Sequence, residues 1–424
     1  MAIDLLKLTR GLTIASMLAL AGVATGACSS QAPGDASTDD GAGSSTDDIT
    51  SVNQSAVKRQ SIGNCWLYAT TSWLEALNKA ATSQEVNTSE SWLTYWHWYE
   101  QLANGRAGAE IETGGGWETA AGLIARYGVT LEKDFIKAEA ESEMSSRQSS
   151  ALNAVNLSLK SGALKDAVAR RDKKAIRKEL DAETTSRINA VFGEGVEKTL
   201  DRAYIAAAPG NGVIRAIDFP ARLKDAQSGQ FVKATLADAV GTGASSWNPR
   251  EGKFAFNTVA YPSDALARRG FWKRVQKALH DEVPVMISWK VDFNALTTDS
   301  HFSFEQLQTR GPGRHGGHMT VAHDYQADVP GIGILKAGEP ATKEQMEKAL
   351  SDDTKIIFLR VKNSWGGIRP DRWNQAAIPG YHDLDYSYLN GPIKVCPGED
   401  APADPSVCTG TVVPFGDAVL PPGY

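Results

Sequence analysis

Three residues that lie far apart in the chain carry the functional groups of a thiol nucleophile and its helpers: Cys65, His318 and Asn363. A cysteine nucleophile needs a base within hydrogen-bond reach and a third group that orients this base. An imidazole supplies the base, and an amide oxygen can accept from its second nitrogen and so fix the tautomer. The three residues therefore indicate acyl transfer through a thioacyl intermediate, provided that the fold brings them together.

Cys65 is expected at the first turn of a buried helix. Gly63 and Asn64, which precede it, are residue types typical of a turn. Apolar or bulky residues recur at helical spacing from position 66 to position 77. At a helix start the helix dipole and the free amide groups favour a thiolate. The backbone N–H of Cys65 and the side chain of Gln60 are candidate donors to an oxyanion. Taken alone, the segment would also fit a small buried side chain.

The base and its partner are each expected at the end of a strand. His318 follows two glycines and opens an alternating apolar segment, which makes it a better candidate than His315 or His323. Asn363 ends an apolar strand in an Asn-Ser-Trp-Gly sequence, and Trp365 would cover the bond between imidazole and amide. Read singly, the first segment fits a histidine of the core and the second fits a turn with a buried tryptophan.

The N-terminal residues indicate a secretory signal and a site of lipid attachment. Residues 1–27 combine a basic start, a short apolar run and small residues, which is typical of a secretory signal. Cys28 follows as in a bacterial lipoprotein, so we expect lipidation there and an outer-membrane lipoprotein of a Gram-negative bacterium. A plain secretory signal is the alternative. Residues 28–50 are expected to be a disordered tether, because they are rich in Ser, Asp and Gly.

The remaining cysteines divide into a pair and a single residue. Cys396 and Cys408 are close together in a C-terminal tail, residues 394–424, and are expected to form a disulfide in an exported protein. Cys65 is then expected to be unpaired. A thiol enzyme outside the cytoplasm must keep this sulfur reduced, and the sequence does not indicate how.

Charge and composition exclude several other classes of function. The formal net charge of −6 gives no basic surface for nucleic acid. No close His/Cys/Glu spacing indicates a metal site, and no cofactor is implied. The expected partners are a peptide or protein substrate and, through the lipid anchor, a membrane.

Together, the three segments resemble the papain superfamily of cysteine peptidases, with the order Cys, His, Asn and the Asn-Ser-Trp-Gly motif at 363–366. The resemblance implies an α+β fold over residues 51–393, with a helical N-terminal lobe and an antiparallel β-barrel-like C-terminal lobe. It also implies that Gly115 and Gly116 line the cleft and pair with substrate backbone, while Trp365 borders it. A side-chain-free edge of this kind admits an extended peptide.

Within that superfamily the chain is most similar to the bleomycin hydrolase-like peptidases. The similarity lies in the aromatic segment 92–99, the Gly-Gly-Gly-Trp segment at 114–117 and a helical insertion at about 141–205. Three features depart from the pattern. Gln60 is five residues before Cys65 instead of six, the C-terminal tail does not match, and the stretch from Cys65 to His318 is longer than usual.

The resemblance implies a cysteine peptidase, but two other functions fit the same residues. A thiol acyltransferase would pass the acyl group to an amine instead of water. A catalytically inactive surface lipoprotein would keep the fold for binding, and the displaced Gln60 favours this alternative. Substrate specificity, endo- versus aminopeptidase action and oligomeric state are not determined by the sequence.

Overall fold

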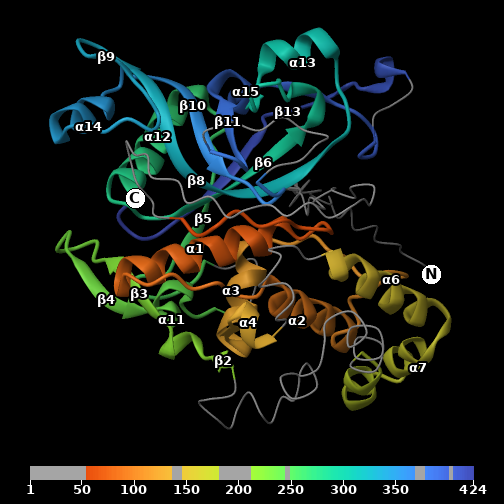
Figure 1. The fold of residues 1–424 in the computed structure, drawn as a ribbon. Coiled ribbons are helices and arrows are strands. Elements are labelled where there is room, and N and C mark those ends of the chain that lie inside the picture. The colour runs from red at the N-terminus through yellow and green to blue at the C-terminus, as the bar shows by residue number, and fades with distance from the viewer. Residues whose placement is uncertain (1–53, 136–145, 181–211, 244–248, 368–377, 401–403) are drawn as a thin grey trace, which may run out of the picture.

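A computed structural model describes residues 54–135, 146–180, 212–243, 249–367, 378–400 and 404–424. The expected signal, the tether and Cys28 lie outside these residues, as do residues 141–145 and 181–205 of the expected insertion. Figure 1 shows helices gathered in the N-terminal half of the chain and a large sheet formed by the C-terminal half.

The N-terminal half is mainly helical. Its helices are α1 (Cys65–Thr82), α2 (Glu90–Ala103), α3 (Trp117–Tyr127), α4 (Glu132–Phe135), α6 (Ser146–Ser161) and α7 (Ala163–Ala169). Helices α6 and α7 fall within the segment expected to be a helical insertion. Two short antiparallel pairs accompany the helices: β1 (Val129–Thr130) with β2 (Val213–Ile214), and β3 (Pro220–Lys224) with β4 (Phe231–Thr235), which is followed by α11 (Leu236–Val240).

The C-terminal half forms an eight-stranded sheet. Its path is β5 (Asn257–Ala260), β14 (Phe415–Leu420), β6 (Val285–Asp292), β8 (His315–Val329), β10 (Lys355–Lys362), β11 (Tyr381–Asp385) and β7 (His301–Phe302), and β9 (Gly333–Leu335) pairs with β8. All pairs are antiparallel except β11 with β7. The path is open, since β5 and β7 do not pair among the described residues, so the expected barrel-like lobe is an open sheet.

The remaining helices flank this sheet. They are α12 (Ala265–His280), α13 (Phe304–Arg310), α14 (Lys343–Ala349) and α15 (Tyr386–Asn390). Helix α12 contacts β6, β8 and β14, while α14 contacts β8. None of the helices in the described part of the chain is both long and apolar enough to cross a membrane.

The C-terminal residues are an integral part of the sheet, which corrects the expected separate tail at 394–424. Strand β14 inserts between β5 and β6, although it is the last strand of the chain. A disulfide joins Cys396 to Cys408. It closes the loop between β12 (Ile393–Val395) and β13 (Gly410–Val412), which pair with each other. The sequence did not reveal β14 because it follows a Pro- and Asp-rich stretch typical of a loop.

Helix α1 is the central element between the two halves. It contacts β8 and β6 of the large sheet and also β3 of the hairpin. Its residues from Cys65 to Asn78 are all buried, so both sides of the helix are covered. Trp73 of α1 makes edge contacts with Trp117 and Phe256, 4.9 Å between ring centroids in each case. These contacts pack the middle of α1 against α3 and against the residue before β5.

Candidate active site

Cys65 is the first residue of α1, directly opposite strand β8. The backbone N–H of Met319 donates to the sulfur of Cys65 at 3.3 Å. The turn before the helix is fixed by Asn64, whose side-chain amide donates to Thr94 (2.9 Å) and to Gln148 (2.8 Å). The sulfur thus lies at a helix start, where a thiolate is favoured, and one residue along the strand from His318.

His318 and Asn363 form a hydrogen bond across neighbouring strands. Nε2 of His318 lies 2.7 Å from Oδ1 of Asn363. This oxygen also accepts from the backbone N–H of Ser364 at 2.7 Å, and the amide nitrogen lies 3.3 Å from Nδ1 of His382. An amide oxygen can only accept, so Nε2 of His318 carries the proton. In the neutral imidazole, Nδ1 is then the basic nitrogen.

Two tryptophans enclose the imidazole. The ring of Trp365 stacks on that of His318, with centroids 4.8 Å apart and planes inclined by 20°. Trp289, the cross-strand neighbour of His318, presents its edge at 5.5 Å. The side chains of His318 and Asn363 are buried, with residue exposures of 5% and 3%. Their hydrogen bond is therefore shielded from water, which strengthens it.

Gln60 lies beside the segment that carries Asn363. Its backbone N–H donates to the carbonyl of Ser364 at 2.9 Å, and its side-chain oxygen accepts from the hydroxyl of the same serine. Its side-chain nitrogen donates to the carbonyl of Ile62 at 2.9 Å. These bonds fix the side chain close to the residues before Cys65. Its service as an oxyanion donor stays a prediction.

The glycine pair approaches the nucleophile segment through Trp66. A Cβ atom on Gly115 would lie 2.5 Å from the ring of Trp66, whereas one on Gly116 would meet nothing within 4 Å. The indole N–H of Trp66 donates to the carbonyl of Thr113 at 2.9 Å. Gly115 is exposed on its other side. Only a residue without a side chain allows this backbone to pass so close to Trp66. Pairing of the two glycines with substrate stays a prediction.

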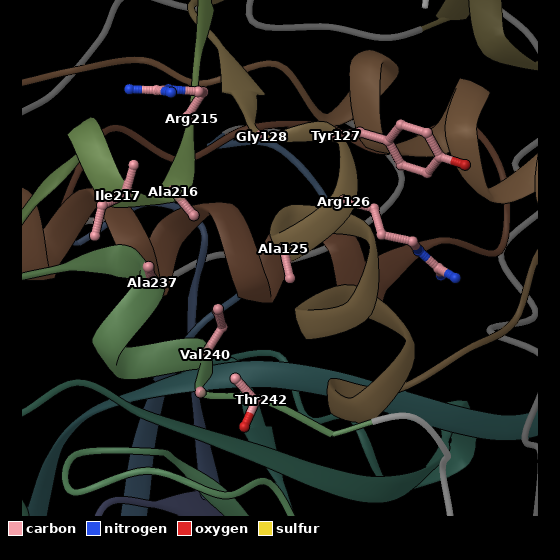
Figure 2. Close-up of a pocket in the computed structure, with 11 residues that line it drawn as sticks. Ala125, Arg126, Tyr127, Gly128, Arg215, Ala216, Ile217, Ala237, Val240 and Thr242 are labelled. Carbon is pink, nitrogen blue, oxygen red and sulfur yellow. The ribbon is translucent and has the colours of Figure 1, made fainter. Parts of the chain in front are cut away.

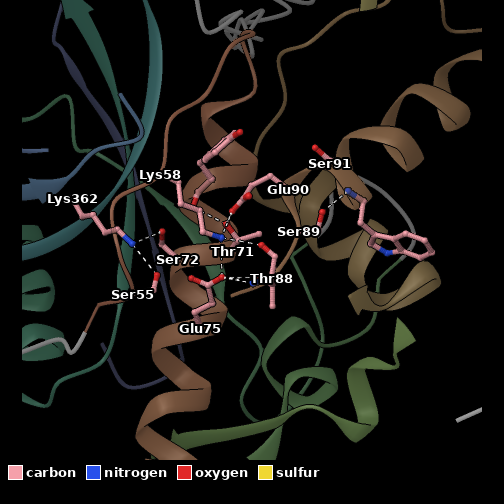
Figure 3. Close-up of polar contacts among 12 residues, drawn as sticks. Ser55, Lys58, Thr71, Ser72, Glu75, Thr88, Ser89, Glu90, Ser91 and Lys362 are labelled. Carbon is pink, nitrogen blue, oxygen red and sulfur yellow. Dashed lines mark hydrogen bonds and ion pairs between the residues drawn. The ribbon is translucent and has the colours of Figure 1, made fainter. Parts of the chain in front are cut away.

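A buried ion cluster fixes the segment that leads to Cys65 (Figure 3). The ammonium group of Lys58 lies 3.1 Å from the carboxylate of Glu75 and 2.8 Å from that of Glu90. Burial opposes ionisation of Glu75, but Lys58 and Lys362 outweigh it and lower its pKa. Burial raises the pKa of Glu90, and the neighbouring charge of Glu75 adds to this effect. The entry segment is thus attached to both α1 and α2.

Cys65 is in a disulfide-bonded form rather than a free thiol. This corrects the expectation that it is unpaired, which rested on counting cysteines alone. Its sulfur must be reduced before it can act as a nucleophile.

Several residues near the site carried no signal in the sequence. Met319 contributes a backbone N–H, which its side-chain type cannot reveal. His382 lies beside Asn363 because β11 pairs with β10, and that pairing is a property of the fold. His97 contacts Trp66 edge-on at 4.9 Å, and burial lowers its pKa to about 4, so it is neutral there. In the sequence, the aromatic helical segment around His97 indicated only that this residue belongs to the core.

Two further features lie apart from these residues. Among the described residues, no three His, Cys, Asp or Glu side chains are grouped to hold a metal ion. A pocket of about 470 Å³ is lined by the end of α3 and by α11, and Figure 2 shows Arg126 and Arg215 among its lining residues. Arg215 is engaged by Asp218 in an exposed ion pair. None of the residues of the candidate active site lines this pocket.

Comparisons with known proteins give distant structural likenesses. No family model and no curated protein matches the sequence. Among solved structures, PepW from Lactobacillus rhamnosis HN001 is similar at 13% identity and a TM-score of 0.42, over 88% of this chain and 81% of that chain. Xylellain, a cysteine protease from Xylella fastidiosa, is similar at 11% identity and a TM-score of 0.34, over 93% and 95% of the two chains.

A third likeness is to the clostridial cysteine protease Cwp84 after propeptide cleavage, at 12% identity and a TM-score of 0.30. The match covers 88% of this chain and 56% of that one. TM-scores below 0.5 do not establish a common fold, so these likenesses do not assign the chain to a family. The functional assignment has to rest on the geometry of the site.

Proposed function

We propose that this chain is a papain-like cysteine peptidase that cleaves peptide bonds through a thioacyl intermediate on Cys65. One observation carries the proposal. The imidazole of His318, oriented by Asn363 at 2.7 Å, stands next to the residue whose N–H contacts the sulfur of Cys65 at 3.3 Å. Three segments remote in sequence supply a nucleophile, a base and an orienting group, as thiol catalysis requires.

The first half of the reaction forms the thioacyl intermediate. With Nε2 held by Asn363, Nδ1 of His318 is the nitrogen that exchanges a proton with the reduced sulfur of Cys65. The thiolate attacks the carbonyl carbon, and the new S–C bond leaves negative charge on the carbonyl oxygen. The N–H of Cys65 at the helix start, with Gln60 as second donor, stabilises this charge. The C–N bond then breaks as His318 protonates the leaving amine.

The second half releases the acyl group. His318 removes a proton from a water molecule, which attacks the thioacyl carbon. The C–S bond breaks, and the acid product leaves with the added oxygen while the sulfur recovers its proton. Water is the co-substrate of this half of the reaction. An amine in place of water would give the acyltransferase alternative.

We also propose that the protein is exported and attached to a membrane through Cys28. The support is the sequence pattern of residues 1–28, which lie outside the described residues. Mass spectrometry of the N-terminal peptide after reduction tests this. A diacylglyceryl thioether and an amide-linked acyl chain on Cys28 are expected. Since a thioether sulfur cannot form a disulfide, the lipidated chain, which has four cysteines, would hold Cys65 as a free thiol. An unmodified Cys28 would refute the anchor.

A kinetic experiment tests the enzyme. The full-length protein, reduced with a thiol reagent, is given a library of fluorogenic peptides. Cys65→Ala and His318→Ala should each abolish turnover, whereas an exposed change such as Lys343→Ala should not. Addition of a free amine distinguishes the two reactions, because an acyltransferase yields amide in place of acid. Two results together would favour the binding protein: no peptide is turned over under any condition, and Cys65→Ala binds peptides as tightly as the unmodified protein.

A further inference from the structure

Asn363 makes hydrogen bonds through both ends of its side-chain amide. Its Oδ1 lies 2.7 Å from Nε2 of His318 and also accepts from the backbone N–H of Ser364 at 2.7 Å. A backbone N–H can only donate, so the contact with Ser364 identifies this atom as the oxygen. The other atom is therefore the NH2 group, and it lies 3.3 Å from Nδ1 of His382. An amide NH2 can only donate, so Nδ1 of His382 accepts.

This contact assigns the tautomer of His382. A ring nitrogen that accepts a hydrogen bond carries no proton, so His382 is neutral with its proton on Nε2. Two imidazoles then have opposite roles on one amide, because His318 donates to its oxygen and His382 accepts from its NH2 group. In such a chain of hydrogen bonds each bond polarises the next. The contact with His382 therefore strengthens the bond between Asn363 and His318.

Strand pairing places His382 beside Asn363 and away from the nearest carboxylate. In the pairing of β11 with β10, His382 lies opposite Val361, two residues before Asn363. Side chains two positions apart share a face, so His382 is a diagonal neighbour of Asn363 on one face of the sheet. Asp383 points to the other face, where the guanidinium of Arg360 binds it at 2.8 and 2.9 Å. The amide is thus the polar group that the strands direct at Nδ1 of His382.

Aromatic rings enclose the imidazole of His382, which is only 2% exposed. The ring of Trp365 meets it edge-on at 5.3 Å, and the ring of Phe302 lies 5.8 Å away. Trp365 also stacks on His318, so one indole contacts both imidazoles. A hydrogen bond that is shielded from water is stronger than an exposed one, and its loss would leave the buried NH2 group of Asn363 without this acceptor.

We propose that His382 is a positioning residue of the candidate active site, whose neutral imidazole accepts from Asn363 and keeps the amide oxygen directed at His318. This rests on the proposed peptidase function. If the amide turned by 180°, its NH2 group would face the Nε2–H of His318, and two donors would oppose each other. His318 would then lose the acceptor that leaves its Nδ1 basic. The N–H of Ser364 resists the same rotation, so the effect of His382 is partial.

Two replacements of His382 separate its hydrogen bond from its volume. His382→Phe keeps a ring but has no acceptor, whereas His382→Gln offers a side-chain oxygen in place of Nδ1. With one fluorogenic peptide and the reduced full-length protein, we expect His382→Phe to lower kcat about five- to tenfold, with KM within about twofold of the parent value. His382→Gln should keep kcat within about threefold. If His382→Phe does not fold, His382→Leu, which also lacks an acceptor, takes its place.

A double-mutant cycle tests whether His382 acts through Asn363. In the Asn363→Ala background, His382→Phe should change kcat by less than about twofold. A full additional loss there would overturn the positioning role. Tyr325→Phe is the matched control, because it removes a 2.7 Å hydrogen bond to His280 toward the far end of β8. This control should lose stability in urea and keep kcat.

The outcomes separate this inference from the proposed function. Equal kcat in a folded His382→Phe and in the parent would overturn the inference and leave the peptidase standing. Equal losses in His382→Phe and His382→Gln would also overturn it, because the acceptor would then not matter. If no peptide is cleaved, the proposed function fails, and alkylation of reduced Cys65 by iodoacetamide decides. Labelling should be slower in His382→Phe than in His382→Gln, and equal rates would overturn the inference.

Discussion

His318 and Asn363 form a 2.7 Å hydrogen bond although 45 positions separate them in the chain. The bond exists because β8 and β10 are antiparallel neighbours, so the end of one strand lies near the beginning of the other. The Asn363 amide is fixed in turn by Ser364 and His382. The pairing of β8 with β10 therefore fixes the orientation of the His318 imidazole.

Replacing Asn363 should weaken catalysis without abolishing it. In Asn363→Ala, the imidazole loses the acceptor for Nε2–H and samples the wrong tautomer. We expect kcat/KM to fall on the order of tenfold to a hundredfold, less than the loss of the general base itself. Steady-state kinetics with one fluorogenic peptide measure this, and unfolding in urea checks that stability is retained. Unchanged kinetics in a folded Asn363→Ala would contradict the orienting role.

The two glycines should respond differently to alanine. In Gly115→Ala, the new methyl group meets the buried ring of Trp66 at 2.5 Å, so the free energy of unfolding should fall by about 1–3 kcal/mol. Gly116→Ala is the matched control, because its backbone is extended and the space is open. Its free energy of unfolding should change by less than about 0.5 kcal/mol. Urea denaturation measures both free energies of unfolding. A loss in Gly115→Ala as small as that in Gly116→Ala would show that Trp66 moves aside to admit the methyl group.

Lys58 should be essential to the fold. In Lys58→Met, the carboxylates of Glu75 and Glu90 lose their shared cation inside the core. Breaking a buried ion pair in this way costs about 3–5 kcal/mol. The control is Lys79→Met, which removes an ion pair to the exposed Glu85 and should cost less than about 1 kcal/mol. Similar stability of the two variants in urea would mean that the cluster contributes little.

Asp417 should lower stability at neutral pH. Its folded pKa of about 6 lies above the usual value of 3.8, so the native state holds its proton more tightly than the unfolded state. The free energy of unfolding therefore falls as the pH rises from about 4 through 6.

Asp417→Asn removes this cost. We expect it to stabilise the protein by up to about 2 kcal/mol at pH 7.5, and by clearly less at pH 5. Glu118 and Arg250 also carry charge near this position, so the comparison uses Asp352→Asn as a control for net charge. Urea unfolding at the two pH values provides the measurement. An equal gain in stability at pH 5 and pH 7.5 would show that the fold does not raise the pKa of Asp417.

The local parts of the site could be predicted from sequence. Cys65 at a helix start and the strand before Asn363 follow from turn residues and periodicity, which act over a few positions. The clustering of the three segments had to be inferred from resemblance. Cross-strand neighbours such as Trp289 and His382 depend on which strands pair, and short-range patterns do not contain that information.

The C-terminal strand was the largest error. Residues 415–420 lie between β5 and β6, and the sequence indicated only a Pro-rich tail. Asp417 was missed for the same reason, because its position opposite Ser288 exists only once β14 is in the sheet. The bonded state of Cys65 was also missed, since the number of cysteines does not determine their pairing.

Labelling with a thiol-directed epoxide tests the central claim most directly. The reduced protein is treated with the epoxide, digested and mapped by mass spectrometry, with His318→Ala and an unreduced sample in parallel. We expect stoichiometric modification of Cys65, loss of peptide hydrolysis in proportion to labelling, and slow labelling in His318→Ala. A reduced, folded protein whose Cys65 reacts no faster than an ordinary thiol, with or without His318, would contradict the peptidase.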